Sequence, residues 1–95
     1  MSSLNSLKII KQYICDNHVF TLCTTSSVGD IWCANCFYWF DESQMRLIFL
    51  SEKKTRHARM MQENLLVAGS ISTQEIAVSD LQGIQFTGSV SLLTG

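Results

Sequence analysis

The residues best suited to chemistry in this 95-residue chain are gathered in one short basic segment, Ser51 to Met61. Four of the seven Lys and Arg residues and one of the two His residues fall there, and no Lys or Arg follows it. Thr55 stands where it can cap a helix, with Arg56 and His57 directly after it. The first N–H groups of a helix are free to donate, so the segment favours an anion such as phosphate. The alternative is a solvated helix start whose charges only keep the surface wet.

A strand must lead into this basic segment and a helix must leave it. Apolar residues recur at helical spacing near the N-terminus, whereas β-branched and aromatic runs separated by turn residues follow it. The expected elements are a helix over 3–16, strands over 19–25, 31–40, 45–50, 65–72 and 84–92, a short extended piece at 76–78, and a two-turn helix over 55–63. Residues 26–30 form the turn of a hairpin. This order predicts one mainly β domain over residues 1–95, a β-barrel with α-helices.

The strand expected over residues 31–40 is apolar on both faces. A strand covered on both sides lies inside a sheet, so we expect it to be central, between the barrel interior and a partner subunit. The whole chain is 46% hydrophobic and only 16% charged. So small a domain cannot bury all of that apolar surface, which favours a homodimer.

Charge and hydropathy exclude two classes of partner. A net charge of −1 lacks the broad basic face that nucleic-acid binding requires. No apolar run approaches the roughly 18 residues of a membrane span, and the N-terminus lacks the order of a signal peptide. We therefore expect a cytoplasmic protein without membrane or nucleic-acid partners.

The cysteines are Cys15, Cys23, Cys33 and Cys36. Only the last two form a C-x-x-C pair, which raises the hypothesis of a thiol redox or zinc site. Residues i and i+3 of a strand point to opposite faces, so their sulfurs cannot converge on one ion without a kink. Free thiols and no metal site are the expected outcome for a cytoplasmic chain.

Three blocks, in order, resemble the pyridoxamine 5'-phosphate oxidase-like FMN-binding split barrels. Among these, the chain looks most like the small, uncharacterised YhbP-like bacterial proteins. The blocks are Ile31-Trp32-Cys33-Ala34-Asn35 with Phe37-Tyr38, Glu52-Lys53-Lys54-Thr55-Arg56-His57-Ala58, and Gly83-Ile84-Gln85-Phe86-Thr87-Gly88. The resemblance covers essentially the whole chain. It implies a split β-barrel of antiparallel strands with an N-terminal helix, a short helix after the third strand, and an absent C-terminal part.

The resemblance also implies a phosphate site in the basic segment. In the oxidases a strand-end hydroxyl and a Ser-Arg-Lys triplet hold the FMN phosphate. By position, Ser51 matches the strand-end hydroxyl, and Thr55, Arg56 and His57 match the triplet, with Lys54 beside them. Arg56 would pair with phosphate oxygens through charge-assisted hydrogen bonds. His57 departs from the family's Lys but still donates one hydrogen bond.

The flavin ring and ribityl chain are contacted by the second strand in this superfamily. Here the corresponding positions are Asn35, Cys36, Phe37 and Tyr38. The fifth-strand Gln of the oxidases is replaced by Gly in this chain. Gln85, two residues on and on the same strand face, is expected to take its place.

The resemblance therefore implies an FMN-binding, oxidoreductase-like homodimer with flavin at the interface and an unknown small-molecule substrate. True pyridoxamine phosphate oxidase activity is not expected, because the oxidases bind their substrate through residues beyond the end of this chain. Haem or deazaflavin are alternative ligands, since similar barrels use both. The competing hypothesis is a non-catalytic or vestigial split-barrel dimer without cofactor.

Overall fold

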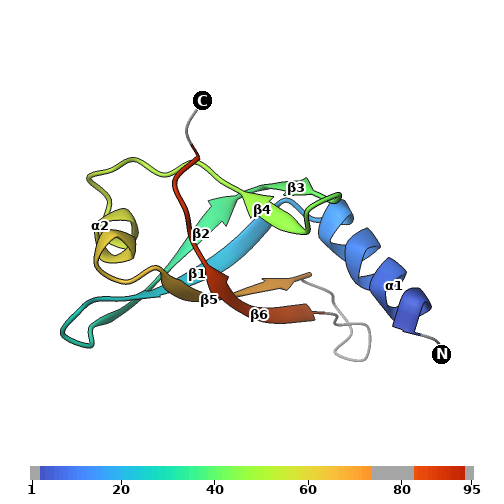
Figure 1. Ribbon diagram of the computed structural model, residues 1–95, viewed down its shortest axis with the longest axis horizontal. Coiled ribbons are helices and arrows are strands. Elements are labelled where there is room, and N and C mark those ends of the chain that lie inside the picture. The colour runs from blue at the N-terminus through green and yellow to red at the C-terminus, as the bar shows by residue number, and fades with distance from the viewer. Residues whose placement is uncertain (1–2, 74–82, 94–95) are drawn as a thin grey trace.

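The computed structural model describes residues 3–73 and 83–93, with side chains from Asn5 onward (Figure 1). The elements are α1 (Ser3–Asp16), β1 (Val19–Thr25), β2 (Ile31–Phe37), β3 (Trp39–Asp41), β4 (Arg46–Ile48), α2 (Arg56–Glu63), β5 (Leu66–Ser72) and β6 (Gly83–Ser89). The two helices lie at opposite ends of an elongated molecule that measures 41 × 33 × 20 Å. The extended piece expected at 76–78 falls outside the described residues.

The strands form two antiparallel sheets. One has four strands in the order β2-β1-β5-β6, and the other pairs β3 with β4. The mainly β class predicted from the sequence, with an N-terminal helix and a short helix after the hairpin strands, is confirmed. Within the described ranges the two sheets do not close into a barrel.

The long strand expected over residues 31–40 is broken at Tyr38, and the prediction that it is central is wrong. The Tyr38 amide donates to the carbonyl of His18 at 2.9 Å, and its hydroxyl donates to the carbonyl of Ile14 at 2.7 Å. These bonds fix Tyr38 to the end of α1, and the chain then turns into β3, which pairs with β4. β2 is an edge strand of the larger sheet. The side chain of Phe37, read as a covered position, is 75% exposed.

One face of the four-stranded sheet forms the core. Along β1 the buried residues alternate strictly, with Phe20, Leu22 and Thr24 all at most 2% exposed. The Phe20 ring packs edge-on against the rings of Tyr38 and Phe49, at centroid distances of 5.7 and 5.3 Å. Each such fully buried apolar side chain contributes about 1.5–3 kcal/mol to stability.

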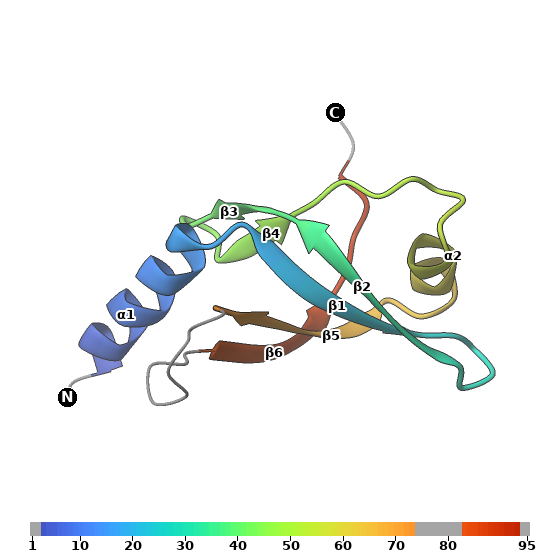
Figure 2. The ribbon, with the colours of Figure 1, turned by 180° about the vertical axis from the view of Figure 1, so that it is seen from behind.

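Helix α2 packs on the same face, over the β1–β2 hairpin. Ala58, Met60 and Met61 are its buried residues, and the Thr24 hydroxyl donates to the Met60 sulfur at 3.7 Å. Figure 2 shows the hairpin running out past α2 to its turn. The helix therefore covers the end of the sheet nearest the basic segment, from which α2 begins.

The opposite face of the sheet, which we call the open face, is lined by the alternate residues of each strand. They are Thr21, Cys23 and Thr25 from β1; Ile31, Cys33, Asn35 and Phe37 from β2; Leu66, Ala68 and Ser70 from β5; and Gln85, Thr87 and Ser89 from β6. Ile31 and Leu66 are 69% and 68% exposed. The open face is thus a mixed apolar and hydroxyl-rich surface within the described part of the chain.

Candidate functional site

The basic segment enters α2 through a well-formed N-cap. Thr55 has extended backbone angles, and its hydroxyl oxygen accepts from the Ala58 amide at 3.3 Å. The same hydroxyl donates to the Glu52 carbonyl at 2.8 Å, which ties the preceding loop to the cap. The helix predicted over residues 55–63 is confirmed, with Thr55 as its cap and Arg56 as its first residue.

Two hydroxyls and an imidazole converge at this helix end. The Ser51 Oγ lies 2.9 Å from His57 Nε2, and the Thr55 Oγ1 lies 3.4 Å from the same nitrogen. His57 and Ser51 are half-buried, so the cluster is set into the surface. In the described part of the chain, the amides of Arg56 and His57 donate to no protein acceptor. The helix end thus offers free N–H donors beside three polar side chains.

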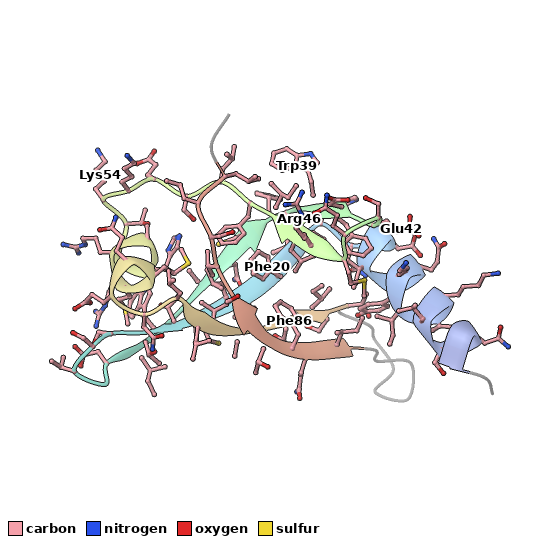
Figure 3. All side chains as sticks on the ribbon, viewed as in Figure 1. Phe20, Trp39, Glu42, Arg46, Lys54 and Phe86 are labelled. Atoms are coloured by element: carbon pink, nitrogen blue, oxygen red, sulfur yellow. The ribbon has the colours of Figure 1, made fainter. Side chains whose placement is uncertain are left out.

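The side chains of Arg56 and Lys54 lie elsewhere. The Arg56 guanidinium carbon is 4.3 Å from the centroid of the Trp32 ring, a cation–π arrangement on the hairpin. Within the described residues Arg56 makes no ion pair, so its N–H groups are free to bind an anion. Lys54 stands on the loop before α2 and points outward (Figure 3).

Beside Arg56, a hollow of about 290 Å³ separates the hairpin turn from α2. Two carboxylates and two guanidinium groups share it, so its charges balance. Its lining residues are Ser26, Asp30, Arg56, Arg59, Met60 and Glu63. The Ser27 hydroxyl donates to the Glu63 carboxylate at 2.8 Å and fastens the turn to the helix. The hollow therefore lies between the hairpin turn and α2 and has no excess of positive charge.

The residues predicted to contact the flavin ring are divided by the sheet. Cys36 is buried in the core, and burial raises the pKa of its thiol. Asn35, Phe37 and Gln85 lie on the open face, away from α2. The Thr21 hydroxyl donates to the Asn35 side-chain oxygen at 2.8 Å. Within a single chain, these three residues therefore do not lie together with the helix end.

Gln85 lines a second, larger hollow on the open face, of about 490 Å³. The lining residues are Cys23, Ala68, Gly69, Ser70, Gln85, Phe86 and Thr87. Its lining combines thiol, hydroxyl and amide side chains with the aromatic residue Phe86, and none is charged. The surface therefore suits an uncharged ligand that has both apolar and polar groups.

Cys23 and Cys33 form a thiol pair that the sequence reasoning missed. Their sulfurs lie 3.1 Å apart, and hydrogen bonding to Cys33, together with burial, raises the pKa of the Cys23 thiol. Cys33 and Cys36 face opposite sides of β2, as expected for residues three apart in a strand. The missed signal was the hairpin register. Residues whose numbers sum to 56 stand opposite each other around the turn at 26–30.

Within the described residues, no group of three or more His, Cys, Asp or Glu side chains could hold a metal ion. Cys33 and Cys36, the C-x-x-C pair, are not part of such a group in the described ranges. No helix of the described part is long and apolar enough to cross a membrane.

Comparison with known proteins places the chain beside uncharacterised relatives. No family model matches it. It is 43% identical, over all 95 of its residues, to proteins named "UPF0306 protein" from Yersinia pseudotuberculosis and Yersinia pestis, and it spans 64% of their length. Its fold is similar to that of the conserved hypothetical protein Rv2991 from Mycobacterium tuberculosis. The TM-score is 0.73 at 18% identity, covering 94% of this chain and 51% of that one.

Proposed function

We propose that the N-terminal end of α2 binds the terminal phosphate of FMN. The protein would then be a cytoplasmic, flavin-dependent oxidoreductase-like homodimer that acts on a small molecule. The observation that carries the proposal is the convergence of Ser51, Thr55 and His57 on a helix end with free N–H groups. The Ser51 hydroxyl, an imidazole N–H and backbone amides are donors that a phosphate monoester accepts from, and the helix dipole favours its charge. Thr55, whose hydroxyl donates to the Glu52 carbonyl, caps the helix that presents these amides.

Arg56 adds a cation within the first turn of the same helix. Stacking on Trp32 leaves the edge of the guanidinium free, and this edge carries the N–H groups that pair with phosphate oxygens. Bound FMN supplies the redox chemistry itself. The residues of this chain hold its phosphate and fix its orientation.

The division of the predicted ring contacts supports a dimer. Because Asn35, Phe37 and Gln85 lie on the face away from α2, a flavin held at the helix would receive them from the partner subunit. The open face also exposes the apolar side chains of Ile31 and Leu66, which a second subunit would cover. Sedimentation of the purified protein at micromolar concentration is expected to show a dimer, and a stable monomer would contradict this part of the proposal.

Titration with FMN and with riboflavin tests the phosphate site, because riboflavin has the same ring but no phosphate. Wild-type protein should bind FMN more tightly than riboflavin. Arg56→Ala should weaken FMN binding by about 2 kcal/mol, roughly 30-fold, and leave riboflavin unaffected. Arg46→Ala is the matched control, since Arg46 is also exposed but pairs with Asp41 at 2.8 Å. Equal affinity for the two flavins would refute the phosphate assignment.

A second candidate, a split-barrel dimer without cofactor, is favoured by the contacts that the site makes with itself. Ser51 already forms a hydrogen bond with His57, and Arg56 already stacks on Trp32. These contacts link the loop, the helix and the hairpin, so the cluster also has a structural role. This candidate predicts no binding of either flavin. It also predicts that Ser51→Ala lowers the unfolding free energy by about 1 kcal/mol, the value of one hydrogen bond.

A further inference from the structure

The thiols of Cys23 and Cys33 are held opposite each other by the backbone of the hairpin. The two residues are direct partners in the register of β1 and β2. The Ser26 amide donates to the Asp30 carbonyl at 2.9 Å, and the Tyr38 amide donates to the His18 carbonyl, also at 2.9 Å. These bonds mark hydrogen-bonded pairs at the two ends of the ladder.

Hydrogen-bonded and non-hydrogen-bonded pairs alternate along an antiparallel ladder. Counting from either end, the even-numbered residues of β1 are in hydrogen-bonded pairs, so Cys23 and Cys33 form a non-hydrogen-bonded pair. In such a pair the Cα atoms are about 4.5 Å apart and the side chains lie closest. This separation falls inside the range that a disulfide spans, and the sulfurs are already 3.1 Å apart. Bond formation therefore needs only a small side-chain adjustment.

The pair is also reachable and distinct from the other two thiols. Cys33 is exposed and Cys23 is half-buried, both on the open face. Cys36 is buried on the other side of the sheet, and Cys15 lies on α1. In a reducing compartment a disulfide of this kind is a transient, reactive one, since stable disulfides are rare there.

We propose that Cys23 and Cys33 form a thiol–disulfide exchange site for low-molecular-weight disulfides, closing into an intrachain cross-strand disulfide. The proposal goes beyond flavin binding and needs no flavin. The exposed Cys33 thiolate attacks one sulfur of the small disulfide, whose S–S bond breaks. One small thiolate leaves and takes up a proton, and a mixed disulfide remains on Cys33.

Cys23 completes the exchange. Its thiol loses a proton to solvent and attacks the Cys33 sulfur, which expels the second small thiol. In sum, two protein thiols are oxidised by two electrons to one disulfide, and the small disulfide is reduced to two thiols. Cys33 attacks first because it is exposed whereas Cys23 is half-buried, and hydrogen bonding to Cys33 together with burial raises the pKa of the Cys23 thiol.

The test incubates the full chain with oxidised glutathione. Wild-type protein should lose two hydrogen atoms in mass, and the four thiols should fall to two on titration after unfolding. Cys23→Ser should stop at the mixed disulfide and retain one glutathione, whereas Cys33→Ser should lose the fast reaction. Cys15→Ser, the matched control, should close its disulfide as wild type does.

Proteolysis identifies the bonded residues. Trypsin leaves all four cysteines in one peptide, whereas cleavage before Asp16, Asp30 and Asp41 separates the peptide with Cys23 from the one with Cys33. We expect these two peptides to be joined, and Cys36→Ala should leave the linkage intact. The proposal is overturned if wild type retains glutathione, keeps four thiols, or forms a disulfide with Cys15 or between chains.

Discussion

Replacing Gly69 with Ala tests how closely β5 and β6 pack within the core. Gly69 stands between Leu22 and Phe86 in the register of the sheet. An added Cβ would lie 2.5 Å from Phe86 Cζ, 2.8 Å from its Cε2 and 3.0 Å from the Thr21 carbonyl oxygen. Carbon atoms in contact prefer about 3.5–4.0 Å, so the ring must move by about 1 Å. The Phe86 ring lies beside that of Phe20, with the two centroids 6.1 Å apart (Figure 3).

The expected loss follows from two opposing effects. Overpacking of this kind lowers the unfolding free energy by about 1–3 kcal/mol. The reduced entropy of the unfolded chain with Ala in place of Gly returns about 0.4–1 kcal/mol. We therefore expect Gly69→Ala to destabilise the protein by about 1–2 kcal/mol. Urea unfolding, with the midpoint and slope both fitted, measures this difference.

Two comparisons isolate the contact. Gly88→Ala is the matched control, because a Cβ there would meet nothing within 4 Å. It should keep only the entropy gain and stabilise the protein by about 0.4–1 kcal/mol. Phe86→Leu removes the two ring atoms that clash, so Gly69→Ala should cost less in that background. The Thr21 carbonyl still leaves a residual cost. Equal losses at Gly69 and Gly88, or effects of Gly69→Ala and Phe86→Leu that add within about 0.5 kcal/mol, would refute the reasoning.

Three further predictions use the same unfolding assay. Burial raises the pKa of Tyr38 from 10.0 to about 12, so the folded state favours the neutral phenol. The stability that this preference contributes is complete below about pH 10 and is lost as the pH rises toward 12. Tyr38→Phe should flatten this alkaline decline and lose about 1 kcal/mol at neutral pH, with the hydrogen bond to Ile14. Thr55→Ala should lose about 1 kcal/mol by removing the α2 cap, which Thr55→Ser should retain. Closing the disulfide between Cys23 and Cys33 should raise the free energy of unfolding by about 2–3 kcal/mol, because it restricts the unfolded chain. The Cys33→Ser variant should show no such increase.

Local signals sufficed for the elements whose residues decide their own conformation. The helical spacing of residues 3–16, the β-branched run at 19–25 and the cap at Thr55 each led to the observed element. The break at Tyr38 could not be predicted locally, because its causes are bonds to the carbonyls of Ile14 and His18, far along the chain or across the ladder. The edge position of β2 was misjudged because apolar residues on both faces also occur on a strand with one exposed side.

The candidate site was predictable in part. The residue types at Ser51, Thr55 and His57 indicated a polar helix end, and the structure brings these three side chains together. The direction of Arg56 was not predictable, since it depends on Trp32 from a strand that precedes α2 by many residues. The same register that places Trp32 also places the thiol pair, and no spacing along one strand reveals it.

The placement of Arg56 against Trp32 and the pairing of the two thiols both depend on the register of a single hairpin. Thr24 and Trp32 face α2, while their neighbours Cys23 and Cys33 face the other side of the sheet. A slip of one residue in β1 would turn every side chain of that strand to the opposite face. Phe20, Leu22 and Thr24 would then leave the core, and Cys23 would no longer lie opposite Cys33. The burial of that alternating set opposes the slip by several kcal/mol at about 1.5–3 kcal/mol for each large apolar side chain. The core residues of β1 thus hold the two thiols opposite each other and keep Trp32 in contact with Arg56.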